Sequence, residues 1–263
     1  MRKKYFTLQK QYMNFCIAKD MQYRMDFASH IITDVIFCFL KIAFVEIFFA
    51  NTNSIYGYSK YEVMFIFGTS FVVISIYMMF SFFSHVDIPK DIRTGYMDIL
   101  LTKPVSPFFL LSFRVFNIGG LGGMVYGVFL VVYAGVKMDL RMSAFHFLLY
   151  ILLILSGTCI YFSISFILFT VAFWTQAAAG FIGILTDMGE AMKYPHTIYP
   201  KSVQIVLSFC FPVLMVASYP ASIVMGKVPV WFAGINVVIG IVLLIGASLF
   251  LRKAISSYQS ASS

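Results

Sequence analysis

Polar and charged side chains within one apolar run are the first candidates for chemistry in this sequence. They recur every three or four residues, so a helix presents them on one side. An ionised group near the centre of a bilayer costs at least about 2.5–3.5 kcal/mol and usually faces a cavity or a partner. We expect these side chains, together with Arg114 and Asn117 further along the chain, to line a substrate path or the seam between two subunits. The alternative is a structural ion pair with another span, for which Arg114 is the candidate partner of Asp34. The residues in the run are His30, Asp34, Cys38 and Lys41.

No enzyme signature accompanies these side chains. The sequence lacks the G-x-x-x-x-G-K-[ST] loop of P-loop ATPases, the H-E-x-x-H zinc motif and a nucleophile elbow. The four cysteines have no motif spacing, which favours buried small side chains over a metal site or a disulfide framework. We therefore expect no catalytic residue, no metal site and no cofactor bound by this chain. Any energy source must come from another subunit or from an ion gradient.

The elements that position these residues are expected to be membrane helices. Hydrophobic residues make up 60% of the chain and charged residues 11%, and the mean hydropathy is +0.88. A soluble domain carries about 25% charged residues. The length of 263 residues leaves room for roughly six spans of about 20 residues each. The composition predicts an all-α integral membrane protein with six transmembrane helices.

The spans are expected to form a single transmembrane domain over residues 27–251. Residues 1–26 are basic and place aromatic side chains on one helical side, which favours an amphipathic helix in the membrane interface over a frayed tail. Residues 252–263 form a polar tail. The clear spans are 27–50, 61–86, 108–136, one that starts near 145, and 230–251.

The distribution of basic residues predicts the orientation. Residues 1–26, the loop 87–107 and the C-terminus together hold eleven lysines and arginines, whereas the loops around Ser59 and Lys137 hold three. Cytoplasmic loops carry the excess of positive charge, so both termini and the loop 87–107 are expected in the cytoplasm of a cell-membrane protein. The net charge of +8 is explained in this way, and we expect no nucleic-acid partner.

Two topologies fit the stretch from Tyr150 to Lys227. In one, residues 202–225 form a kinked span after a cytoplasmic loop. In the other, the fifth span ends before Lys193 and residues 194–226 form a broken, re-entrant segment at the outer surface. The parts of this segment before and after Pro212 have only about ten residues each. That is too few to cross a membrane alone, which favours the second topology. The interrupting prolines are Pro195, Pro200, Pro212 and Pro220.

Two further patterns concern packing and docking. The third span holds three glycines at intervals of four, which allow two helices to approach closely, either within the subunit or across a dimer. The segment 87–103 packs six charges between two apolar runs. As one helix it has an apolar stripe of Ile88, Ile92, Gly95, Tyr96 and Ile99, although Gly95 also permits two short helices. The alternative is a solvated interfacial loop. The glycines are Gly119, Gly123 and Gly127.

The stretch "IRTGYMDILLTKPVSPFF" resembles the signature of the permeases of ABC-2-type transporters, in the form I-x-x-G-x-[ML]-D-x-x-L-x-x-P-[VI]-x-P. Downstream, "KYPHTIYPKSVQIVLSFCFPVLMVASYPASIVMG" resembles the outer-leaflet proline-rich segment of that family. The span count, the basic N-terminal helix and the chain length agree with the same family. The signature is matched by Ile92, Gly95, Met97, Asp98, Leu101, Pro104, Val105 and Pro107.

The resemblance implies a half-permease that pairs with an identical or homologous second permease on two cytosolic P-loop ATPases, which bind ATP and magnesium. In that family the loop between spans two and three is the coupling helix that docks on the ATPase, and residues 1–26 resemble the connecting helix beside it. By resemblance the ATPase-coupling residues are Ile88, Ile92, Arg93, Gly95, Tyr96, Asp98, Ile99 and Lys103.

The expected function is therefore that of the membrane subunit of an ATP-driven exporter working by alternating access. Its substrate is expected to be amphipathic, lipid-like or drug-like, because the aromatic spans favour an apolar path. Two alternatives remain open at this point: an ion-coupled secondary transporter, and a membrane scaffold or assembly protein without transport activity.

Overall fold

The computed structural model describes residues 2–22, 24–50, 52–175 and 179–258. Helices, connected by turns and irregular segments, make up these ranges, apart from one bridge between Ile55 and Tyr58. Among the described residues, four helices are long and apolar enough to cross a membrane. The prediction of an all-helical, multi-pass membrane protein is thus confirmed, whereas six spans stay a prediction. The four helices are Lys60–Arg93, Gly120–Lys137, Ala144–Thr175 and Phe232–Ser256.

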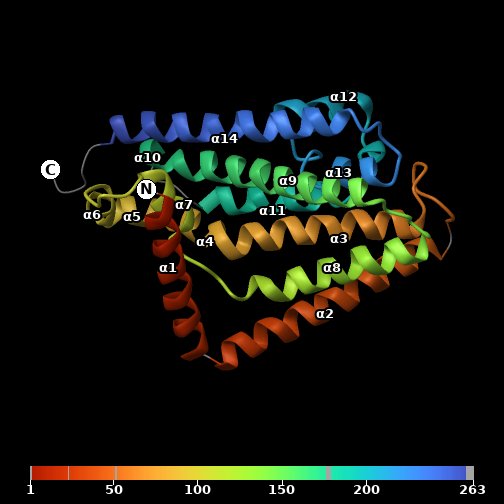
Figure 1. Cartoon of the computed structure of the whole chain (residues 1–263), viewed down its shortest axis with the longest axis horizontal. Coiled ribbons are helices and arrows are strands. Elements are labelled where there is room, and N and C mark those ends of the chain that lie inside the picture. Colours follow the sequence, from red (N-terminus) through yellow and green to blue (C-terminus); the bar gives the residue numbers. More distant parts are fainter. Residues whose placement is uncertain (1, 23, 51, 176–178, 259–263) are drawn as a thin grey trace.

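The helix α3 (Lys60–Tyr77) forms the centre of the bundle (Figure 1). Ser59 and Glu62 begin it with a capping box, in which each side chain accepts a hydrogen bond from the backbone N–H of the other residue. Helices α8 (Gly120–Lys137) and α9 (Ala144–Thr170) pack against α3, and most of the α3 surface is buried. The outward faces of α8 and α14 (Phe232–Ser256) are instead apolar and exposed, as expected for surfaces in contact with lipid.

The helix that contains α3 does not stop at the end of the apolar run. It continues through a π-helical turn η1 (Met78–Phe82) and α4 (Phe83–Val86) into α5 (Ile88–Arg93), so that 34 residues follow one another in helical conformation. A second short helix, α6 (Tyr96–Leu101), follows after a break at Gly95. The two-helix alternative for the segment 87–103 is therefore the one observed.

The N-terminal segment forms α1 (Arg2–Gln22), and α2 (Arg24–Phe49) begins shortly after it. In Figure 1, α1 runs crosswise at one end of the bundle, whereas α2 lies along it. Cys16 is buried and packs with Met13 and Ile17 near Phe116, while Phe6 on α1 is exposed. The helix thus holds to the bundle by one side, and its position in a membrane interface stays a prediction.

The predicted third span, 108–136, is interrupted. Residues 107–113 form α7 (Pro107–Phe113), the backbone then leaves the helix, and α8 begins only at Gly120. Backbone N–H groups in the gap find partners outside a helical ladder, which removes the need for continuous helix. The donor and acceptor pairs are Val115 N to Ser84 Oγ (3.0 Å), Phe116 N to Cys16 Sγ (3.5 Å), Asn117 N to Met79 O (2.9 Å) and Gly119 N to Asn117 Oδ1 (2.6 Å).

The stretch from 179 to 231 follows the second of the two topologies in its helices. Helix α11 (Ala179–Ala191) ends before Lys193, and a broken segment follows. That segment contains a 3₁₀ turn η2 (His196–Ile198), a helix of ten residues formed by α12 (Lys201–Ile205) and a π-helical turn η3 (Val206–Cys210), and α13 (Ser218–Val224). A single kinked span over 202–225 is therefore not observed, because the chain leaves helical conformation around Pro212.

The broken segment 194–226 packs at the end of the bundle where the α2–α3 turn lies, opposite α5 and α6 (Figure 1). The Tyr58 hydroxyl lies 2.8 Å from Ser222 Oγ, and the Lys227 ammonium donates a hydrogen bond of 2.6 Å to the Gly57 carbonyl. Residues 212–224 are buried between neighbouring helices, so their irregular backbone is covered by protein. At the other end of the bundle α14 runs five residues beyond the predicted end of the last span at Leu251.

Candidate functional site

The short helices α5 and α6 form a knob at one end of the bundle, and the side chains predicted to dock on an ATPase divide there into two groups. Ile88 and Ile92 are buried in the main core, whereas Tyr96 and Ile99 are 41% and 56% exposed. The prediction of one continuous apolar stripe is therefore wrong. Gly95 adopts a left-handed conformation (φ 70°), which turns α6 relative to α5 and redirects its side chains.

The two groups have different tasks. Ile88 and Ile92 of α5, with Met97 and Leu100 of α6, anchor the knob in the core, and they are too buried to contact a partner. The exposed surface instead forms a hollow of about 450 Å³ on the outside of the knob. Arg93 is exposed next to it, Asp98 is in the first turn of α6, and Lys103 follows that helix. The hollow is lined by Lys90, Asp91, Thr94, Gly95, Tyr96 and Ile99.

A buried ion pair connects the knob to the bundle. The guanidinium of Arg114 pairs with the carboxylate of Asp91 and lies 3.3 Å from that of Asp87. The side chains of Arg114 and Asp91 are 11% and 8% exposed, so solvent screens the pair weakly. Arg114 was expected on a substrate path or as the partner of Asp34; it lies instead at the root of the knob. Asn117 likewise closes the turn before α8 through its bond to Gly119 N, away from the hollow on the knob.

A second group of charged side chains lies between α2 and the end of α11. Lys41 of α2 has its Nζ 3.8 Å from Oε1 of Glu190 on α11, and Lys193 pairs with the same oxygen. Both ammonium groups also lie over the ring of Phe71 on α3, at 5.3 Å and 5.5 Å from its centroid. The side chains of His30, Asp34 and Cys38, expected on the same side of α2, lie outside the described residues.

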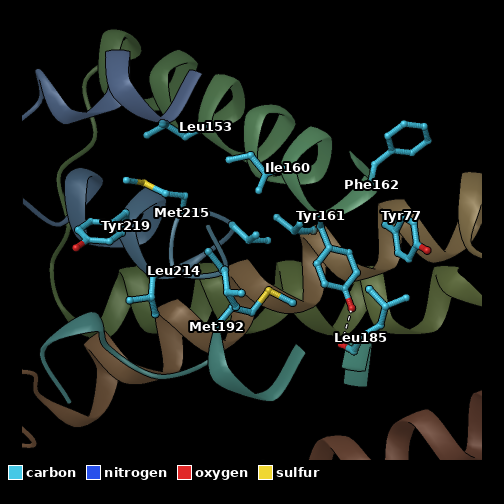
Figure 2. Packing of buried hydrophobic residues seen from close by; sticks show 14 of the residues in the cluster. Tyr77, Leu153, Ile160, Tyr161, Phe162, Leu185, Met192, Leu214, Met215 and Tyr219 are labelled. Atoms are coloured by element: carbon cyan, nitrogen blue, oxygen red, sulfur yellow. Dashed lines mark hydrogen bonds between the residues drawn. The ribbon is translucent and has the colours of Figure 1, made fainter. Parts of the chain in front are cut away.

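Glu190 and Lys193 were missed by the sequence reasoning. Their spacing of three places them on one side of a helix end, which is the only signal that the sequence offers. They line a cleft of about 280 Å³ whose other walls are mainly aromatic and aliphatic. Figure 2 shows one of these walls, where the Tyr161 hydroxyl donates a hydrogen bond of 2.9 Å to the Leu185 carbonyl.

The glycine row of the third span lies only partly where it was predicted. Gly123 and Gly127 face α3, and a Cβ at Gly127 would lie 2.8 Å from Val72 N and 2.9 Å from Gly68 O. Gly119 is outside α8 and faces only Asn117, so its assignment to helix packing is wrong. The glycine that continues the row is Gly120, against Met79 and Ser75. The row therefore packs two helices of one subunit.

The predicted outer prolines shape the broken segment. Pro195 precedes η2, Pro200 precedes α12, Pro212 follows η3, and Pro220 lies in the first turn of α13, where proline is tolerated. Next to them, the ring of His196 stacks on Tyr219 at 4.6 Å between centroids. Burial lowers the pKa of His196 below its ordinary value, so the ring is neutral near pH 7.

Comparison with known families matches residues 35–262 to one family model, described as ABC-2 family transporter protein. Searches of curated proteins and of solved structures gave no match. The matched range covers the long apolar helices, the α5–α6 knob, the charged cleft and the broken segment. The chain therefore belongs to the ABC-2 family of transporter proteins.

Proposed function

We propose that this chain is the membrane subunit of an ATP-driven exporter and that α5 and α6 are the part on which a cytosolic ATPase docks. Membership of the family implies association with an ATP-binding-cassette ATPase in general. The observation that supports the specific role is the construction of the knob. Its inward side chains belong to the main core, while Tyr96 and Ile99 are exposed beside a hollow.

The knob is suited to transmit movement. A docking element coupled to membrane helices must move with them as a rigid body. Four buried apolar side chains and the Arg114–Asp91 pair attach α5 and α6 to the bundle, and α5 continues the same helix as α3. In the proposed mechanism, closure of two ATPase subunits displaces the knobs of two permease chains, identical or homologous. The bundles then change from an inward-open to an outward-open arrangement.

The proposed orientation places both termini and the knob in the cytoplasm and the segment 194–226 at the outer surface, with six spans per chain. The basic residues on α1 and around the knob favour this orientation. We propose α2 as the fifth span and α11, whose 13 residues extend about 20 Å, as a shorter sixth one. The cargo is proposed to be amphipathic, in keeping with a path that is mainly apolar.

The experiment begins with tagged full-length chain purified from its native membrane in mild detergent, followed by identification of co-purifying P-loop ATPases. The identified ATPase and the permease are then reconstituted in vesicles, and ATP hydrolysis is measured with and without the permease. Ile99→Glu places a charge on the exposed knob surface and is expected to lower both association and stimulated hydrolysis. The matched control is Val230→Glu, an exposed aliphatic side chain at the opposite end of the bundle.

If both variants bind the ATPase as well as the wild-type chain does, the knob is not the docking site. Transport driven by an ion gradient in vesicles that contain no ATPase would overturn the proposal as a whole and favour a secondary transporter. A sidedness test with a membrane-impermeant, cysteine-reactive probe on single-cysteine chains is expected to label position 99 from the cytoplasm and position 230 from outside.

A further inference from the structure

The cleft between α3, α9 and α11 has an apolar floor that ends in a charged group. One wall is formed by successive turns of α3 and η1 from Phe71 to Phe82, which corresponds to about 16 Å at 1.5 Å per residue. Tyr161 of α9 closes one side, and Ile182 and Leu185 of α11 close the other. The cleft is therefore an elongated trough that follows the helix axis.

The charged end of the trough carries more positive than negative charge among the described side chains. Lys41 and Lys193 share a single carboxylate, that of Glu190. Lys193 is buried, whereas the side chain of Glu190 is 54% exposed. The two ammonium groups have more donor capacity than one carboxylate oxygen and one aromatic ring satisfy, since each ammonium has three N–H donors. A ligand anion at this point would supply the missing acceptors.

The size of the trough limits the tail. A volume of 280 Å³ holds roughly nine groups at about 30 Å³ each, the share of a water molecule in the liquid. That is room for part of one acyl chain and not for two side by side. The π-helical turn η1 provides Met78 and Phe82 to the lining, and such turns frequently occur at functional sites.

We propose that the trough binds a single-chain anionic amphiphile, with the chain along α3 and the anionic head group on Lys41 and Lys193. A carboxylate and a phosphate head share the chemistry that two ammonium groups recognise. We further infer that this amphiphile is the transported cargo, and that step rests on the function proposed above. The existence of the binding site does not. Glu190 then has a second task, because it neutralises the empty site and competes with the head group for both lysines.

Binding is measured with the full chain in nanodiscs of zwitterionic lipid, without any ATPase. The probe is 11-(dansylamino)undecanoate, followed by its fluorescence, and the same tail with an ammonium head group is the matched probe. Lys193→Gln and Lys41→Gln are each expected to weaken binding of the carboxylate probe about tenfold, as for one charge-assisted hydrogen bond. Lys227→Gln, at a lysine near the α2–α3 turn, is the control and is expected to leave binding unchanged.

Two further variants show whether weaker binding in the lysine variants comes from a lost ligand contact or from misfolding. Glu190→Gln removes the competing carboxylate and is expected to tighten binding, a result that damaged protein does not give. Thr186→Trp fills the trough without changing its charge and is expected to abolish binding of the probe. Competition by dodecyl phosphate and by inorganic phosphate separates an amphiphile from a free anion: the first is expected to displace the probe and the second is not.

Equal binding of the two probes by the wild-type chain, or unchanged binding in Lys193→Gln and Thr186→Trp, would overturn the inference. These results do not depend on the ATPase experiment. Loss of the probe site with ATPase coupling intact removes only the ligand, whereas a working probe site with no ATPase partner removes only the proposed function.

Discussion

The close approach of α3 and α8 allows a test in which the same substitution, glycine to alanine, is expected to lower stability at one position and to raise it at another. Gly127→Ala adds a methyl group 2.8 Å from Val72 N and 2.9 Å from Gly68 O, roughly 0.5–0.6 Å inside the shortest ordinary contact of 3.4 Å. Both neighbours are backbone atoms of a helix, which cannot rotate away as a side chain can. The two helices must therefore separate along a contact that is among the most extensive in the described chain.

The magnitude follows from two opposing effects. Overpacking of this kind typically costs about 1–3 kcal/mol. Alanine in place of glycine within a helix returns about 0.5–1 kcal/mol. The net expectation for Gly127→Ala is a loss of about 0–2.5 kcal/mol, centred on about 1.3 kcal/mol, which lowers Tm by about 3–5 °C for a domain of this size.

Gly246→Ala is the matched control, because Gly246 also lies within a long helix, α14. A methyl group added at Gly246 would contact no neighbouring element, since no heavy atom outside its own helical turn lies within 4 Å. It is expected to gain about 0.5–1 kcal/mol from helix propensity alone. The assay heats purified protein in detergent and measures the remaining monodisperse fraction by size-exclusion chromatography. A rise in Tm for both variants would refute the close approach of α3 and α8.

Two further predictions concern charge. Asp91→Asn leaves the buried Arg114 with only Asp87 and is expected to destabilise the protein by about 3 kcal/mol, while Glu46→Gln, in an exposed pair, is expected to change stability by less than about 1 kcal/mol. Equal melting temperatures of these two variants would contradict the burial of the first pair. Because burial lowers the pKa of folded His196, the unfolded chain takes up a proton first; stability is expected to be flat above about pH 6.5 and to fall below it until the lowered pKa is passed. His196→Phe is expected to remove that part of the acid dependence, measured as Tm between about pH 5 and pH 7.5, and an unchanged profile would contradict it.

The sequence was sufficient where a pattern depends on neighbours along the chain. Hydropathy located the long helices, and the charge run located the segment that became α5 and α6. The helical stripe correctly grouped Ile88 with Ile92, since both lie on one regular helix. It failed for Tyr96 and Ile99, because a single residue with positive φ at Gly95 changes the direction of every side chain after it.

The sequence was insufficient where the deciding partner is distant along the chain. The gap before α8 exists because Cys16, Ser84 and Met79 offer hydrogen-bond partners to backbone groups about thirty to one hundred residues away. The helix propensity of the residues in the gap does not indicate that such distant hydrogen-bond partners exist. The charged end of the cleft likewise required Lys41 to meet Glu190 across two helices, which spacing within either helix does not reveal.

The helix from Lys60 to Arg93 has a mechanical consequence. Its 34 residues extend about 51 Å at 1.5 Å per residue, whereas the hydrocarbon core of a bilayer is about 30 Å thick. Such a rod reaches from the α2–α3 turn to the knob and acts as a lever, because its successive helical turns follow one another without an intervening loop. The widened turn at Met78–Phe82 is its most compliant point. A displacement of the knob would thus be converted into a tilt or a bend at the mouth of the apolar trough, where the turn contributes two of the lining side chains.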